Sequence, residues 1–236
     1  MHCTVFGPLS LILVLTAASG CVGVAGNGHR ARETRELRAF SKIESHGPFA
    51  VDAARGDDFT ARVSIDSNLI DHLETHVYGD TLEIDSDAWI ADLLPGPHLV
   101  ITLPRLESAT VSGSGDLVIH GFDSDEPLRL SASGSSDLTF DGSAPKITAS
   151  VSGSGDMQLH GGTEFAELEV SGSGNLDARE LIASEADVTV SGSGNLRATI
   201  DGPVGAAVSG SGDIDLYGDV QREHFSESGS GDIRVH

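Results

Sequence analysis

A short pattern that returns seven times dominates this chain of 236 residues. One copy is VSGSGDL at 111–117. The others keep a residue that is usually small and apolar, then Ser, Gly, Ser, Gly or Ser, Asp or Asn, and an aliphatic residue. A unit this short cannot bury an apolar face alone, so the repeats must stack into one continuous core. The copies lie 18 to 21 residues apart and begin at Val111, Ala132, Val151, Val170, Val190, Val208 and Glu227.

Apolar residues alternate with polar ones on both sides of each copy. Ala109 and Val111 precede the first Ser-Gly pair, and Leu117 and Ile119 follow it. Alternation with period two is typical of a half-buried strand, so each repeat reads strand, tight corner, strand. About 20 residues per unit fits one coil of a parallel β-helix, because a propeller blade needs about 40. The sequence therefore predicts an all-β fold, a parallel β-helix (solenoid) with about 20 residues per coil and Ser-Gly corners.

The corner residues are predicted to be structural. Glycine permits the positive φ and the close backbone approach that a sharp corner needs. A serine copied seven times is not a unique nucleophile, and no catalytic residue is predicted. The predicted structural corner residues are Ser112, Gly113, Ser114, Gly115, Asp116, Ser152, Gly153, Ser154, Gly155, Asp156, Ser171, Gly172, Ser173, Gly174, Asn175, Ser191, Gly192, Ser193, Gly194, Asn195, Ser209, Gly210, Ser211, Gly212 and Asp213.

Two polar columns of the repeat could have further roles. The corners end in Asp or Asn, and these side chains either bind cations or accept hydrogen bonds from nearby backbone N–H groups. We favour the backbone role, because the period is unlike the nine-residue period of calcium β-rolls. A second column contains His120, Asp141 and His160, which could line up as metal ligands. With no fourth partner, an exposed polar strand end is the simpler interpretation, and no metal or cofactor is predicted.

Composition excludes some functions. The formal net charge is −22, which repels phosphate backbones and argues against nucleic-acid binding. Aromatic residues are only 5%, so platforms that stack on bases or sugars are poorly supplied. Both cysteines, Cys3 and Cys21, lie at the N-terminus, so the repeats have neither a disulfide nor a cysteine metal site.

The N-terminus has the pattern of a bacterial lipoprotein signal. Residues 4–20 form an apolar run that ends in small residues, and Cys21 follows. The run is short for a membrane-spanning helix, and plain secretion and a spanning anchor are the alternatives. We predict a signal peptide over 1–20, lipidation of Cys21, and a flexible tether over 21–36.

The remaining chain is predicted to be one domain over 37–236. Residues 111–236 contain the seven repeats, and residues 37–110 are expected to form irregular N-terminal coils that cap the stack. Within them, HVYGDTLEID at 76–85 is typical of a tight turn between two strands. Residues 68–73 could form one helical turn capped by Asn68. At the other end, Glu227 replaces the apolar residue of its column, which predicts a polar cap open to water.

Three segments resemble the bacterial DUF2807 family, also described as putative auto-transporter adhesin, head GIN domain. They are FSKIES at 40–45, DSNLIDHLETHVYGDTLEID at 66–85 and HLVITLPRLESATVSGSGDL at 98–117. The resemblance extends over about residues 37–236 and includes the repeated corners. It implies a β-helix-like domain outside the cytoplasm, and it brings no catalytic residues.

Together these features predict a non-enzymatic, adhesin-like binding module of the bacterial cell envelope. Its expected partners are the membrane, through the lipid anchor, and an unidentified envelope or surface ligand, protein or polysaccharide. If the host is Gram-negative, the location would be the outer membrane or the periplasmic side. A carbohydrate-active enzyme and a cation-dependent structural module are the alternatives.

Overall fold

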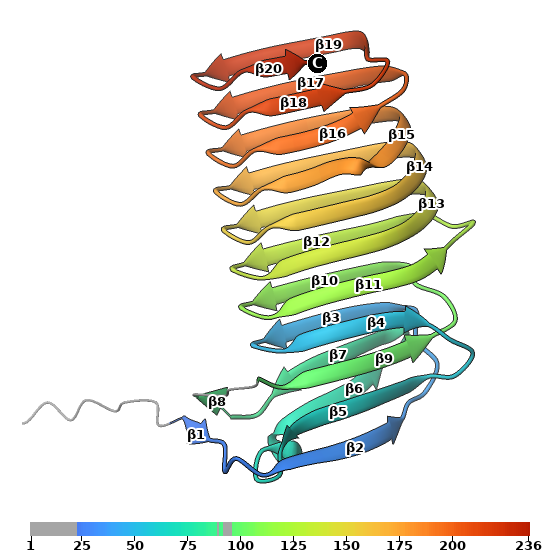
Figure 1. Ribbon diagram of the computed structural model, residues 1–236, viewed down its shortest axis with the longest axis vertical. Coiled ribbons are helices and arrows are strands. Elements are labelled where there is room, and N and C mark those ends of the chain that lie inside the picture. Colours follow the sequence, from blue (N-terminus) through green and yellow to red (C-terminus); the bar gives the residue numbers. More distant parts are fainter. Residues whose placement is uncertain (1–22, 89, 92–95) are drawn as a thin grey trace, which may run out of the picture.

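The computed structural model describes residues 23–88, 90–91 and 96–236. Their strands form one 18-stranded sheet that winds into a solenoid, together with a separate two-stranded pair. Figure 1 shows the coils stacked in chain order from β10 to the C-terminus. The predicted fold class, an all-β parallel solenoid with coils about 20 residues apart, is confirmed.

Each regular coil has one strand that enters the Ser-Gly corner and one that leaves it. The entering strands form the first face of the solenoid, and the leaving strands form the second face. Entering strands are β10 (Ser108–Gly113), β12 (Leu128–Gly134), β17 (Pro203–Gly210) and β19 (Gln221–Gly229). Leaving strands are β11 (Asp116–Asp123), β16 (Leu196–Ile200), β18 (Ile214–Tyr217) and β20 (Ile233–Val235).

Three long strands in the middle of the stack serve both faces. They leave one corner, bend at the opposite edge and enter the next corner. In the first of them the burial alternation changes phase around Pro145 and Lys146, where the strand bends from the second face to the first. The three are β13 (Asp137–Gly153), β14 (Met157–Gly172) and β15 (Leu176–Gly192).

The core lies between the two faces and follows the predicted alternation. Parallel pairing in register places Val111 beside Ala132, and Leu138 beside Met157. All four side chains are at most 1% exposed. Burying one large aliphatic side chain contributes about 1.5–3 kcal/mol, so these columns are the main source of stability.

The N-terminal part adds two coil layers that are out of chain order. β3 (Lys42–Gly47) and β4 (Ala50–Arg55) lie directly against β10 and β11. β7 (Thr81–Ser86) and β9 (His98–Leu103) lie beneath them, also in parallel. The pair β3–β4 is therefore inserted between a layer that follows it in sequence and the first SGSGD coil.

Antiparallel strands close this end, so the prediction that irregular coils fill 37–110 holds only for those two layers. β5 (Thr60–Asp66) runs antiparallel to β9, and β6 (Leu73–Tyr78) runs antiparallel to β7, as expected for the tight turn at 76–85. A reversed strand covers the sheet edge without starting another coil. Strand β1 (Val24–Ala25) pairs separately with β8 (Ile90–Ala91).

Two local predictions are wrong. Residues 30–36 are not a flexible tether, because β2 (Arg30–Glu36) pairs with β5 along its whole length. The helical turn exists as η1 (Ile70–His72), but Asn68 does not cap it and Leu69 occupies the N-cap position. Instead the Asn68 amide bonds the backbone of Ala25 and Asn27, which fastens the N-terminal segment to the domain.

Candidate functional site

The first glycine of each corner has a backbone conformation that other residues rarely adopt. Gly153 has φ +123° and Gly172 has φ +130°. A Cβ atom at Gly153 would also lie 2.4 Å from the carbonyl oxygen of Gly134 in the preceding coil. The corner therefore needs glycine for its φ and for its space.

The second glycine is required by space. A Cβ at Gly174 or Gly194 would lie 2.0 or 1.9 Å from a backbone oxygen of the coil beneath. Phe49 occupies the equivalent place in the β3–β4 coil, and its carbonyl oxygen fills the space that Gly115 leaves open. These contacts explain why the corners repeat so faithfully without any chemical role for their glycines.

The Asp and Asn residues that end the corners form a column, which we call the Asx ladder, and its side-chain hydrogen bonds run from Asp137 to Asp232. Its members are Asp116, Asp137, Asp156, Asn175, Asn195, Asp213 and Asp232. Asp137 Oδ1 accepts a hydrogen bond of 2.7 Å from the N–H of Asp156, and Asp156 Oδ1 accepts one of 2.9 Å from the N–H of Asn175. Asn195 and Asp213 continue the series upward. The side chains thus accept hydrogen bonds from backbone N–H groups, as the favoured interpretation proposes. The N–H groups that they cap belong to the next coil.

The ladder distributes its charge unevenly. Burial and then the neighbouring Asp137 raise the pKa of Asp116. At the other end, the N–H of Asp232 and then Arg234 lower the pKa of Asp213. Between them Asn175 and Asn195 each donate a side-chain hydrogen bond to the preceding member, which interrupts the row of carboxylates.

The histidine column is assembled in register. His120 pairs with Asp141 across β11 and β13, and Asp141 pairs with His160 across β13 and β14. Within the part of the chain that the structure describes, no group of three His, Cys, Asp or Glu side chains could hold a metal ion.

One corner serine has a histidine partner. His46 Nδ1 lies 2.7 Å from Ser112 Oγ, because β3 places His46 next to Ser112 on the first face. Glu44, the nearby carboxylate, is 3.8 Å from His46 Nε2, which is beyond hydrogen-bond reach. A Ser–His pair without an orienting third group lacks the geometry of an activated nucleophile.

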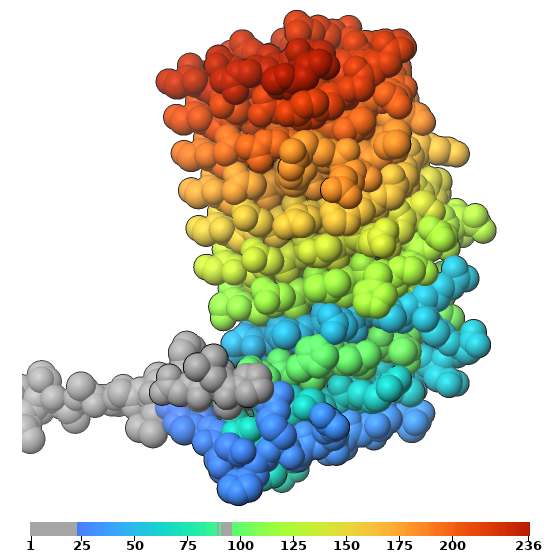
Figure 2. Space-filling view, viewed as in Figure 1, coloured from blue at the N-terminus to red at the C-terminus, as the bar shows by residue number. Residues whose placement is uncertain are grey.

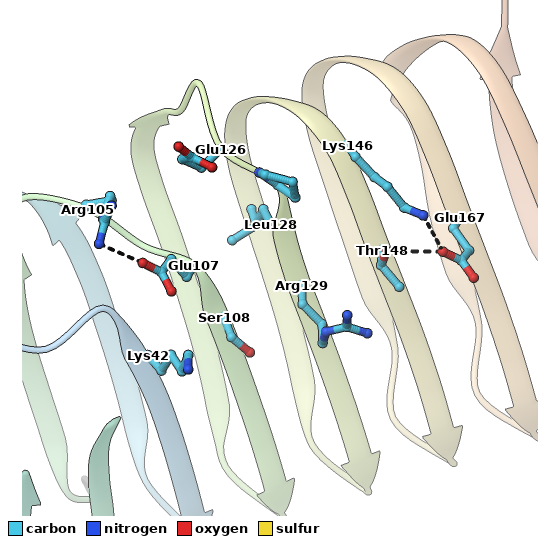
Figure 3. A pocket seen from close by; sticks show the side chains of 11 residues that line it. Lys42, Arg105, Glu107, Ser108, Glu126, Leu128, Arg129, Lys146, Thr148 and Glu167 are labelled. Carbon is cyan, nitrogen blue, oxygen red and sulfur yellow. Dashed lines mark hydrogen bonds and ion pairs between the residues drawn. The ribbon is translucent and has the colours of Figure 1, made fainter. Parts of the chain in front are cut away.

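A charged groove of about 630 Å³ crosses the first face at β3, β10, β12, β13 and β14. Figure 3 shows its side chains projecting from neighbouring coils. Parallel register produces one of its rows: Lys42 lies beside Ser108, Ser108 beside Arg129, and Arg129 beside Thr148. Glu167 is the next member.

Most charges of the groove are already paired. Lys42 Nζ lies 2.9 Å from Asp80, a hydrogen bond that raises the pKa of Lys42 and lowers that of Asp80. Lys146 bonds Glu167 at 2.9 Å and lowers its pKa. Thr148 also donates to that carboxylate, at 3.3 Å. Arg105 pairs with Glu107 at 2.7 Å.

Arg129 differs from these cations. It lies near the centre of the groove, between Ser108 and Thr148 of the adjoining coils (Figure 3). Among the residues that the structure describes, Arg129 is exposed and its guanidinium forms neither an ion pair nor a hydrogen bond, although its charge helps to lower the pKa of Glu167. Within the described residues the groove therefore offers one guanidinium without an ion pair, beside three paired cations and the exposed carboxylate of Glu126.

Sequence reasoning missed the groove, although the sequence contains a signal for it. Its central row consists of the residues five positions before each corner glycine: Lys42, Ser108, Arg129, Thr148 and Glu167. The row becomes visible only when Gly47 is recognised as a corner glycine, and Gly47 indeed pairs with Gly113. Both lysines of the chain, Lys42 and Lys146, line this groove.

The predicted lipidation site, Cys21, and the signal peptide lie outside the described residues. In the described part of the chain, no helix has the length and apolar character needed to cross a membrane.

Solved structures share this fold. A putative adhesin from Bacteroides fragilis is 21% identical, with a TM-score of 0.80 over 91% of this chain and 100% of that one. A putative adhesin from Parabacteroides distasonis is 20% identical, with a TM-score of 0.76 over 90% and 99%. A structure from the same species described as a putative lipid binding protein is 22% identical, with a TM-score of 0.72 over 90% and 99%.

No curated protein matches the sequence. The family profile described as putative auto-transporter adhesin, head GIN domain, matches residues 39–220, which is most of the solenoid. On that match the chain belongs to the DUF2807 family.

Proposed function

We propose that this protein is a non-enzymatic, adhesin-like binding module that a lipid on Cys21 holds at the bacterial cell envelope. The groove on the first face is its ligand site. The observation that carries this proposal is the free guanidinium of Arg129 in a groove whose other cations are paired with carboxylates. Such a groove is suited to holding a ligand.

Two further findings support binding over catalysis. The corner serines belong to turns whose glycines are required by their φ angles and by space, so the whole corner has an architectural role. The Ser112–His46 pair lacks a carboxylate within hydrogen-bond distance of the histidine. The family description and the names of two structural neighbours point in the same direction, since both use the word adhesin.

The anchor and the binding role are tested together in a bacterial host that lacks the protein. Cells carry the full chain, the Cys21→Ala chain or an empty vector, and are fractionated to locate the protein. Their retention under flow is then measured on immobilised polysaccharides and glycoproteins. We expect the full chain in the membrane fraction and increased retention on at least one surface. The Cys21→Ala chain should be released or unprocessed and give no increase.

Two results would contradict the proposal in different ways. If the Cys21→Ala chain is processed normally and stays in the membrane, the lipid anchor is wrong. If cells with the full chain are retained no better than vector cells on every surface, the binding role is wrong.

A further inference from the structure

We propose that the groove around Arg129 binds an acidic glycan through the carboxylates of its sugar units. This inference rests on the proposed function and adds the chemical class of the ligand.

The first argument is the distribution of positive charge. The chain has 14 Lys and Arg residues against 36 Asp and Glu. Four of the 14 cations line this one groove: Lys42, Arg105, Arg129 and Lys146. They come from β3, the loop before β10, β12 and the bend of β13, so stacking brings together residues that are far apart in sequence. Three carboxylates, Glu107, Glu126 and Glu167, also line the groove, so its cations are in slight excess on an otherwise acidic molecule, which lets an anion approach there.

The second argument is the geometry around Arg129. A guanidinium presents its N–H groups as a planar fork that matches a carboxylate in two parallel hydrogen bonds. Among the described residues nothing occupies that fork, whereas Glu107 and Glu167 already bind Arg105 and Lys146. Ser108, in register beside Arg129, adds a hydroxyl that can both donate and accept. One carboxylate and one sugar hydroxyl can thus be bound at adjoining positions.

The third argument concerns the kind of chain that fits. The strands that cross the groove are paired on both sides, so no free strand edge is available for an added peptide strand. The lining is mostly charged and hydroxylated, with Leu128 buried beneath it, so apolar side chains find no pocket. The ring of Phe165 is covered by the Lys146 ammonium, 5.0 Å from its centroid. A neutral sugar would lack a stacking surface, and a charged, polyhydroxylated chain suits the groove best.

The acidic surface gives the interaction a specific salt dependence. Repulsion between a polyanion and the −22 chain acts over a long range, about 30 Å at 0.01 M salt and about 10 Å at 0.1 M. Attraction at Arg129 acts at contact and is strongly screened only near 1 M, where the range is about 3 Å. Affinity should therefore rise from 0.01 to about 0.1 M salt and fall towards 1 M.

The experiment uses the full mature chain in detergent and isothermal titration with a short oligogalacturonate. Fully methyl-esterified oligogalacturonate is the uncharged control, and short polyglutamate tests an acidic peptide. The variants are Arg129→Gln and Arg197→Gln, which remove the same charge from the groove and from the second face. Melting curves test whether both variants fold like the parent chain.

We expect the oligogalacturonate to bind, its methyl ester not to bind, and Arg129→Gln to weaken binding about tenfold or more, which is ~1.4 kcal/mol. Arg197→Gln should change the affinity less than about twofold, since it lies outside the groove. Equal binding of acid and ester, or equal losses in both variants, would overturn the proposal. So would Arg129-dependent binding of polyglutamate alone. If cells are retained on surfaces while Arg129→Gln has no effect on glycan binding, the ligand class fails and the binding role stands.

Discussion

At the scale of single residues, the backbones of successive corners touch so closely that they leave no space for a side chain. A Cβ at Gly155 would lie 1.9 Å from the carbonyl oxygen of Ser136, and rigid backbone on both sides cannot move away. Gly155→Ala should therefore destabilise the protein by about 1 to 3 kcal/mol, the usual cost of overpacking. Urea unfolding followed by circular dichroism measures the change.

Gly162 provides the matched control for this substitution. The nearest atom to a Cβ there is 3.9 Å away, and the backbone conformation is ordinary. Gly162→Ala should leave stability unchanged or raise it by up to about 1 kcal/mol, because alanine restricts the unfolded chain. Similar losses at both positions would show that the contact between the corners is not the cause.

Removing a charge should change the melting temperature in opposite directions at the two ends of the Asx ladder. The raised pKa of Asp116 means that its ionised form disfavours folding at neutral pH, so Asp116→Asn should raise the melting temperature there. The lowered pKa of Asp213 means that its ionised form favours folding, so Asp213→Asn should lower it. Asparagine keeps the acceptor oxygen that Asp213 offers to the N–H of Asp232, as it does at Asn175 and Asn195.

The pH dependence separates charge from packing. Unfolded Asp has a pKa of about 3.9. The benefit of Asp213 should be present above that value and be lost as the pH falls through its lower folded pKa. The cost of Asp116 should appear above its raised folded pKa and vanish below about pH 3.9. Melting curves between neutral pH and pH 3 test this, and differences that do not change with pH would contradict the electrostatic account.

At the scale of elements, the sequence predicts the regular coils because their signal is local. Leu117 and Ile119 alternate with polar residues, and the same pattern returns in each repeat. The β3–β4 layer was expected only as an irregular coil, because Pro48 and Phe49 replace the second serine and second glycine of its corner. Phe49 is fully buried in that corner.

The antiparallel end and the groove were harder to predict for another reason. Alternation identifies a strand but not its direction or neighbour, so β2, β5 and β6 could not be distinguished from coil strands. The groove depends on which coil lies beside which, and β3 reaches β10 across 60 residues of intervening chain. Arg129 and Lys42 acquire a common site only through that pairing.

The antiparallel end depends on one side chain in particular. Arg35 of β2 donates hydrogen bonds to the carbonyls of Leu73 and Ile70 and to the hydroxyl of Thr75. Arg35→Ala should cost about 1 to 3 kcal/mol and speed amide hydrogen exchange in β2 and β6. Arg32→Ala is the control on the same strand, because Arg32 is exposed. Equal exchange rates in the two variants would show that Arg35 does not fasten the edge strand.

At the scale of the whole molecule, a solenoid has two ends that must not continue. Figure 2 shows the coils as parallel rows that stop at the red C-terminal row. That row consists of β19 and β20, and β19 is exposed at almost every residue. A strand that is paired on one side only can accept another strand on its free edge, so its side chains must prevent association.

Glu227 is the residue that marks this end. Its partner in the coil beneath is the buried Val208, yet Glu227 itself is exposed, as its sequence predicts, and accepts a hydrogen bond of 2.9 Å from the N–H of Ile233. His236, at the end of the same coil, contacts Asp215 and stacks on Tyr217.

Glu227→Val would extend the apolar column to the open edge and leave the N–H group of Ile233 without its acceptor. We expect the variant to fold and to associate end to end as its concentration rises, most simply as a dimer of two C-terminal edges. Size-exclusion chromatography with light scattering measures this, with Glu169→Val as the control, because it makes the same exchange at an exposed position in the middle of the stack. A Glu227→Val chain that stays monomeric at high concentration, or a Glu169→Val chain that associates equally, would show that this carboxylate is not what keeps the solenoid from growing.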